Sequence, residues 1–251
     1  MIETTHDDAI PAATLVVWRD APAGPRILVV ERSERMAFAA GAIVFPGGRI
    51  DEGDRILAAA LGRPDAGHKV TAIRETLEES GVAAGFGGSI GPALGSELQR
   101  VLNDGADFAG LVADRGLTLD LDALTPFARW MPGFKHARKF DTIFYLVRAP
   151  EGEWHPFPQP GECVAAEWAS PAELVERIER GDASAIFPTK RNLERLAQFG
   201  SLEEAIASAR AHPVETIIPW IEEVGGEKFV RIPDDIGYPV TSEPLTSAMR
   251  A

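Results

Sequence analysis

The chain has 251 residues, of which 45% are hydrophobic and 25% are charged, as in an ordinary globular protein with a sizeable core. Its formal net charge of −13 at pH 7 argues against binding nucleic acid through bulk electrostatics, so we expect no nucleic-acid partner. The single cysteine, Cys163, excludes an internal disulfide framework and suits a reducing compartment. Residues 1–10 are polar and acidic, and no apolar run approaches the roughly 18 residues of a membrane span. We therefore expect a cytoplasmic protein with no membrane partner.

The N-terminal half of the sequence predicts three strands followed by helices. Runs of apolar residues favour strands over 12–18, 26–31 and 42–45. The third run leads into Phe45-Pro46-Gly47-Gly48, whose paired glycines predict a tight turn that lets the backbone pass close to a helix or a ligand. A helix is predicted over 71–82, a loop over 83–95, and two short helices over 96–103 and 106–114.

The C-terminal half alternates between predicted strands and helices. Strands are predicted over 124–131, 140–149 and 164–168, and helices over 170–180, 189–199 and 202–211. The tail carries two further strand-like runs, 216–221 and 228–232, separated by Gly225-Gly226. Strands mixed with helices predict an α/β fold, a three-layer α/β/α sandwich around a mixed sheet. We expect one domain over 1–251, with an insertion at about 55–69, a helical insertion at about 96–114 and a helical extension from about 189.

The helix over 71–82 carries a carboxylate face. At about 100° per residue, Glu75, Glu78 and Glu79 lie within about one turn of each other, opposite an apolar stripe that includes Ile73 and Leu77. Such a face is often only solvated, with Arg74 pairing to Glu78 four positions on. The alternative is a hard divalent cation such as Mg²⁺, which takes carboxylate oxygens and removes their mutual repulsion.

Taken together, the glycine loop and this helix resemble the Nudix box, the signature G-x5-E-x7-R-E-U-x-E-E-x-G-U, in which U is a bulky apolar residue. The matching positions are Gly48, Arg74, Glu75, Glu78, Glu79, Gly81 and Val82. Asp54 stands where the pattern has Glu, and Thr76 occupies an apolar position. Residues 55–73 separate Asp54 from Arg74, where the pattern has only seven residues.

The resemblance implies a metal-dependent hydrolase of nucleoside diphosphate derivatives with Mg²⁺ or Mn²⁺ as cofactor. It implies metal ligands at Glu75, Glu78 and Glu79 and catalytic roles for Glu75 and Glu79. Arg74 is expected to orient a carboxylate, and Gly48 to lend backbone near the metal. A carboxylate outside the box often completes such a site, and Glu162 is the better candidate while Glu167 is the second.

A second informative stretch, residues 130–142, precedes a predicted strand. It gathers Lys135, His136, Arg138 and Lys139 in an otherwise acidic chain. A solvated loop would explain these charges, and so would a phosphate clamp in which Arg138 and Lys139 bind the substrate. The pattern W-x-x-P followed by R-K-F-D-T, the insertion inside the box and residues 188–196 are similar to the Nudix branch that hydrolyses coenzyme A and acyl-CoA.

The function that we expect is hydrolysis of a pyrophosphate bond in a small nucleotide-containing metabolite. The branch resemblance favours CoA or acyl-CoA, with 3′,5′-ADP and (acyl)phosphopantetheine as products. Other Nudix substrates, such as NADH, ADP-ribose or a nucleotide sugar, are the first alternative, and a non-catalytic nucleotide-sensing domain is the second. The apolar run over 217–221 makes a homodimer a further expectation.

Overall fold

The computed structural model describes residues 9–36, 39–133 and 139–248. Its main sheet contains β1 (Ile10–Arg19), β2 (Arg26–Arg32), β3 (Ile43–Val44), β4 (Gly47–Arg49), β7 (Thr125–Trp130), β8 (Phe140–Arg148), β9 (Cys163–Ala169) and β10 (Thr216–Ile217). The order in space is β10-β7-β8-β1-β2-β3, with β4 also paired to β1 and β9 to β2. β1 runs parallel to β8 and β10 parallel to β7, whereas the other pairs are antiparallel, so the sheet is mixed.

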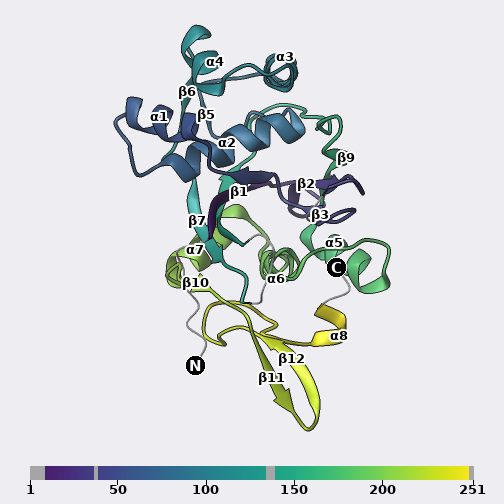
Figure 1. Cartoon of the computed structure of the whole chain (residues 1–251). Helices are drawn as coiled ribbons and strands as arrows, with labels where there is room; N and C mark the ends of the chain where they lie inside the picture. The colour runs from purple at the N-terminus through teal and green to yellow at the C-terminus, as the bar shows by residue number, and fades with distance from the viewer. Residues whose placement is uncertain (1–8, 37–38, 134–138, 249–251) are drawn as a thin grey trace.

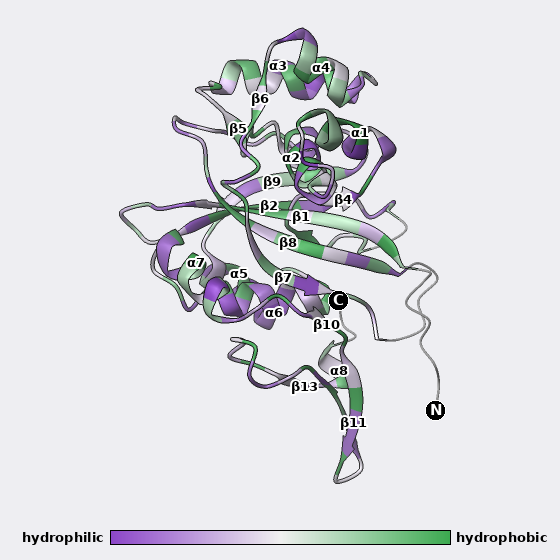
Figure 2. Cartoon of the chain, turned by 90° about the vertical axis from the view of Figure 1, so that its left-hand side faces the viewer, coloured by the Kyte–Doolittle hydropathy of each residue, from purple (hydrophilic) through white to green (hydrophobic). Residues whose placement is uncertain are grey.

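Helices cover both faces of the main sheet. One face carries α1 (Glu52–Ala60), α2 (Gly67–Ser80), α3 (Pro92–Asn103) and α4 (Phe108–Asp114). The opposite face carries α5 (Pro171–Arg180), α6 (Phe187–Leu196) and α7 (Leu202–Ala211), as Figure 2 shows. The predicted three-layer α/β/α architecture is therefore confirmed. No helix in the described part of the chain is long and apolar enough to cross a membrane.

Strand β1 shows how the two cores form. Side chains alternate between the faces of a strand, so Leu15 and Val17 pack into the core beneath α2. Val16 and Trp18 enter the second core, beneath α5, α6 and α7. Because both faces are covered, the strand reads as one continuous apolar run, and all four side chains are fully buried.

The insertions predicted from the sequence contain short helices. The first holds most of α1, whose Leu57 and Ala58 enter the core beneath α2. The second holds α3 and α4, but α3 begins at Pro92, inside the predicted loop over 83–95. Part of that loop is also a strand, because β5 (Phe86–Gly87) pairs with β6 (Thr118–Leu119) at the base of this insertion.

Two local predictions were wrong. The paired glycines do not form a turn but lie in β4, where Gly47 pairs with Thr14 and Gly48 with Ala13. The predicted strand over 216–221 is divided at Pro219, which lacks the N–H that a continuous ladder needs, into β10 and β11 (Trp220–Val224).

β11 belongs to a small separate sheet. It pairs with β12 (Glu227–Arg231), and β12 pairs with β13 (Ser242–Pro244), which leads into α8 (Leu245–Ala248). The hairpin turn uses Gly225 and Gly226, both with positive φ, as a tight antiparallel connection requires. The β11–β12 arm projects from the side of the main sheet opposite to α2 (Figure 1).

Candidate active site

The first feature of the site is a buried ion pair between α1 and α2. Arg74 donates from Nε to Asp54 Oδ1 at 2.8 Å and from Nη2 to Asp54 Oδ2 at 2.9 Å. Asp54 Oδ2 also accepts from the Thr71 hydroxyl at 2.8 Å and from the Asp51 N–H at 3.0 Å. Burial alone would lower the pKa of Arg74, but the hydrogen bonds that it donates to Asp54 and the charges of Glu75, Asp54 and Glu78 raise this pKa above its usual value. The shorter acid at the Glu position of the box thus reaches the arginine in spite of the insertion.

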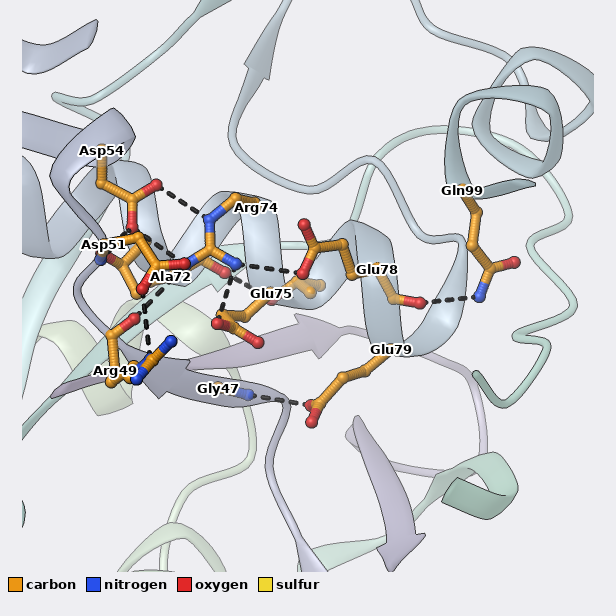
Figure 3. Close-up of polar contacts among 12 residues, drawn as sticks. Gly47, Arg49, Asp51, Asp54, Ala72, Arg74, Glu75, Glu78, Glu79 and Gln99 are labelled. Atoms are coloured by element: carbon orange, nitrogen blue, oxygen red, sulfur yellow. Dashed lines mark hydrogen bonds and ion pairs between the residues drawn. The ribbon is translucent and has the colours of Figure 1, made fainter. Parts of the chain in front are cut away.

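Arg74 also holds two of the predicted metal ligands (Figure 3). Its Nη1 lies 2.8 Å from Glu75 Oε1 and 3.0 Å from Glu78 Oε2. One guanidinium therefore lies within 3.0 Å of three carboxylates, with a bidentate fork on Asp54 and its Nη1 on Glu75 and Glu78. Arg74 is thus positioned to orient these carboxylates, and its role in the reaction stays a prediction.

The glycines of β4 bring backbone against Glu79 and Glu75. The Gly47 N–H donates to Glu79 Oε2 at 3.0 Å, and Figure 3 shows Glu79 pointing from α2 toward that strand. A Cβ on Gly48 would lie 2.4 Å from Glu75 Oε1, closer than any side chain tolerates. Glycine is thus required at position 48 for Glu75 to lie against the strand.

Burial and mutual repulsion raise the pKa values of the carboxylates in the cluster. Burial raises the pKa of Glu75 to about 7, with Arg74 opposing the shift and Glu78 adding to it. Burial also raises the pKa of Glu78. The pKa of Glu79 is raised by burial and, in addition, by the charge of Glu75. The cluster therefore has more buried negative charge than its neighbouring cations offset, which is the condition that a divalent cation relieves.

The donor set fits a hard cation, although the described residues do not converge as a formed metal cage. Among them, no group of three or more His, Cys, Asp or Glu side chains is placed to hold one ion. Glu75 and Glu78 are each turned onto Arg74, and Glu79 onto the Gly47 N–H. Of the three carboxylates, Glu78 is the most exposed, at 21% of its side chain, against 15% for Glu75 and 2% for Glu79.

The two candidates for an outside carboxylate lie in different surroundings. Glu162 is exposed on the loop before β9, and its charge contributes to the raised pKa values of Glu78 and Glu79. Glu167 instead pairs with Arg177 of α5 at 2.7 Å. The structure thus brings Glu162, and not Glu167, into electrostatic range of the box carboxylates.

Of the predicted phosphate clamp, Arg138 lies outside the described residues. Lys139 is described, and its carbonyl accepts from the Ile10 N–H at 2.7 Å at the start of β1. Pro11, which follows Ile10, accepts through its carbonyl from the Ile50 N–H at 2.9 Å, and Ile50 is the first residue after β4. The backbone at Lys139 and the end of β4 therefore both lie at the start of β1.

Two residues of the site were not singled out from the sequence. Arg32, at the end of β2, places Nη1 3.9 Å from Glu79 Oε1, and its buried Nε has no hydrogen-bond partner among the described residues. Gln99 of α3 donates from Nε2 to the Glu78 carbonyl at 3.1 Å and to the Phe157 carbonyl at 2.8 Å. Arg32 could have been found as a cation closing a buried strand, whereas Gln99 depends entirely on how the insertion folds.

Comparisons with known proteins agree with this geometry. No family model matches the chain. The chain is 28% identical to the acyl-coenzyme A diphosphatase NUDT19 of Gallus gallus, over 87% of the chain and 75% of that protein. It is also 28% identical to the acyl-coenzyme A diphosphatase NUDT19 of Homo sapiens, over 81% of the chain and 69% of that protein.

A solved structure matches more closely in identity. The crystal structure of a NUDIX hydrolase from Alicyclobacillus acidocaldarius aligns with a TM-score of 0.71 and 31% sequence identity. The match covers 80% of this chain and 96% of that one. Since nearly all of that hydrolase is matched, and the arginine, carboxylates and glycines of the signature meet in one site, the chain belongs to the Nudix hydrolase family and is an enzyme of that family.

Proposed function

We propose that this Nudix hydrolase splits the pyrophosphate bond of CoA or an acyl-CoA to give 3′,5′-ADP and (acyl)phosphopantetheine. The choice of substrate rests on the 28% identity to two acyl-coenzyme A diphosphatases over 87% and 81% of the chain. These alignments are long enough to include the elements outside the box. The small substrate also suits a chain whose net charge of −13 disfavours nucleic acid.

We propose Mg²⁺ or Mn²⁺ as the cofactor, held by Glu75, Glu78, Glu79 and Glu162. Support comes from the chemistry of the donors, which are carboxylate oxygens, and from burial that disfavours their charged forms without a cation. When bound, such an ion supplies charge neutralisation at the phosphate oxygens and acidifies a coordinated water.

The side chains of the site divide the remaining work. In the reaction, a water oxygen attacks phosphorus, the P–O bond of the anhydride breaks, and the proton of the water passes to a base. Glu75 is proposed as a metal ligand or as the base, since its carboxylate lies against Gly48 beside the other carboxylates of the cluster. Arg74 keeps Glu75 and Glu78 oriented, and the Gly47 N–H fixes Glu79. Arg32, Arg138 and Lys139 are proposed to offset charge on the phosphates.

The test is product analysis by liquid chromatography and mass spectrometry. The purified chain is incubated separately with CoA, an acyl-CoA, NADH, ADP-ribose and a nucleotide sugar, each with Mg²⁺, with Mn²⁺ and with chelator. Glu79→Gln removes a proposed ligand, and Glu167→Gln is the matched control because its carboxylate is engaged with Arg177.

Metal-dependent 3′,5′-ADP that is lost in Glu79→Gln and kept in Glu167→Gln is the expected result. Cleavage of a different compound supports the proposed hydrolysis of a pyrophosphate bond but overturns CoA and acyl-CoA as the substrate. Equal turnover in chelator overturns the metal proposal.

A further inference from the structure

The segment 155–160 covers the C-terminal end of the carboxylate helix. The Phe157 N–H donates to the Ser80 carbonyl at 2.9 Å, and the Gln159 N–H donates to the Glu79 carbonyl at 3.2 Å. From the other side, Gln99 Nε2 joins the Phe157 carbonyl to the Glu78 carbonyl. The backbone of Phe157 is therefore fixed through both of its polar groups, to Ser80 directly and to Glu78 through the Gln99 side chain.

This segment also has little conformational freedom of its own. Pro156, Pro158 and Pro160 alternate with the other residues, and each proline fixes φ and offers no N–H. Few alternative conformations are thus open to the backbone on either side of Phe157.

The Phe157 ring is exposed despite this rigid support. Its exposed fraction is 62%, and the only other exposed large aromatic side chain among the described residues is Trp220, at 43%. Trp220 lies on the β11–β12 arm, on the side of the main sheet opposite to α2 (Figure 1). Trp18 and Trp130, which could also have served as stacking surfaces, are buried in the core. Phe157 is thus the exposed ring attached to the helix that carries the site.

The same segment leads directly to the carboxylate cluster. Gln159 accepts through its carbonyl from the Cys163 N–H at 3.0 Å, which turns the chain back into β9. Glu162 lies in that turn, and its charge reaches Glu78 and Glu79. One short stretch of backbone therefore connects an exposed aromatic ring with the place where the phosphates are expected.

We propose that Phe157 is the platform on which the adenine ring of the substrate stacks, and that Gln99 is the positioning residue that holds this platform against α2. A nucleobase fits because stacking on an aromatic ring needs only a flat π-face. Because the backbone is already fixed, little ordering cost arises when the base binds. The inference rests on the proposed function, since adenine is the base of CoA and acyl-CoA.

The experiment measures binding and turnover on the same full-length variants. Affinity for 3′,5′-ADP is measured by isothermal titration calorimetry with Mg²⁺, and KM and kcat are measured with CoA. The variants are Phe157→Ala, Phe157→Leu and Phe157→Tyr, and Trp220→Ala is the control for losing an exposed aromatic ring. Since Phe157 is exposed, thermal unfolding should show the same stability in all of them.

For Phe157→Ala and Phe157→Leu we expect 3′,5′-ADP affinity to fall about tenfold and KM for CoA to rise by a similar factor. kcat should stay within about twofold, and Phe157→Tyr should restore binding because it keeps the ring. Trp220→Ala should change neither quantity. Wild-type affinity in Phe157→Ala, or in Phe157→Leu, overturns the stacking proposal.

The two proposals fail separately. A wild-type chain that binds 3′,5′-ADP through Phe157 but does not cleave CoA supports the platform and overturns the proposed function. Cleavage of CoA that is unaffected by Phe157→Ala supports the proposed function and overturns the platform. Absence of 3′,5′-ADP binding to the wild-type chain also overturns the platform.

Discussion

Arg74 and Asp54 are 20 positions apart in the sequence, yet they form a bidentate, buried ion pair at the centre of the site. Asp54 lies in the first turn of α1 and Arg74 lies in α2, and the rest of α1 with the loop that follows returns the chain to the start of α2. The insertion therefore lengthens the connection without separating the two charged groups that the signature joins.

Breaking this pair should destabilise the protein. For Asp54→Asn we expect the free energy of unfolding to fall by about 3 kcal/mol, because a buried guanidinium loses its counter-charge. kcat should fall as well, since Arg74 then no longer fixes Glu75 and Glu78. Urea unfolding and steady-state kinetics measure the two effects. Asp122→Asn, which disrupts a fully exposed pair with Arg63, should leave both unchanged. Equal effects in the two variants would contradict the structural role of Asp54.

Adding one methyl group at Gly48 should damage catalysis more than folding. Its Cβ would lie 2.4 Å from Glu75 Oε1, so the carboxylate must move away from the strand. For Gly48→Ala we expect kcat to fall about 10- to 100-fold, as displacement of a catalytic group by about 1 Å costs that much. Gly91→Ala is the control, because a Cβ there meets nothing within 4 Å. Near-wild-type kcat in Gly48→Ala would show that Glu75 need not lie where the structure places it.

The sequence predicted the layers and the carboxylate helix because both depend on local periodicity. Apolar runs identified β1, β2, β3, β7, β8 and β9 of the main sheet, and helical spacing placed Glu75, Glu78 and Glu79 together. The signature predicted Arg74 as an orienting group, which its contacts with Glu75 and Glu78 match.

What the sequence did not predict depends on contacts between distant segments. Paired glycines favour a turn locally, but pairing with β1 draws Gly47 and Gly48 into an extended strand. Gln99 has no local signal at all, because its partner Phe157 is 58 positions away. The predicted strand over 216–221 had the wrong end, because whether Pro219 ends a strand depends on whether the chain continues in the same sheet.

The stability of the metal-free protein should fall as pH rises from about 4.5 to about 7. Burial raises the pKa of Glu75 from 4.5 to about 7, so in this window the folded state binds more protons than the unfolded state. Deprotonation then favours the unfolded state, by an amount on the order of 3 kcal/mol for this group at most. Burial also raises the pKa of Glu194 to about 7, which adds a second contribution with the same sign.

Thermal unfolding in chelator across this pH range measures the effect. Glu75→Gln and Glu194→Gln should each flatten the slope, and Mg²⁺ should flatten it in the wild-type chain, because the cation favours the charged carboxylates. A wild-type slope in Glu75→Gln would show that Glu75 keeps an ordinary pKa in the folded protein.

Removing the amide of Gln99 should loosen the end of the carboxylate helix. Gln99→Leu keeps a side chain of similar size but leaves the Glu78 and Phe157 carbonyls without their shared donor. Two lost hydrogen bonds predict a fall of about 2 kcal/mol in the free energy of unfolding. Because Phe157 is then held from one side only, KM for CoA should rise more than kcat falls. Gln198→Leu is the control, since its amide makes only long contacts, 3.3 and 3.5 Å, at the surface. A loss of stability with unchanged KM would limit Gln99 to a structural role, because positioning of the Phe157 platform requires that substrate affinity change with it.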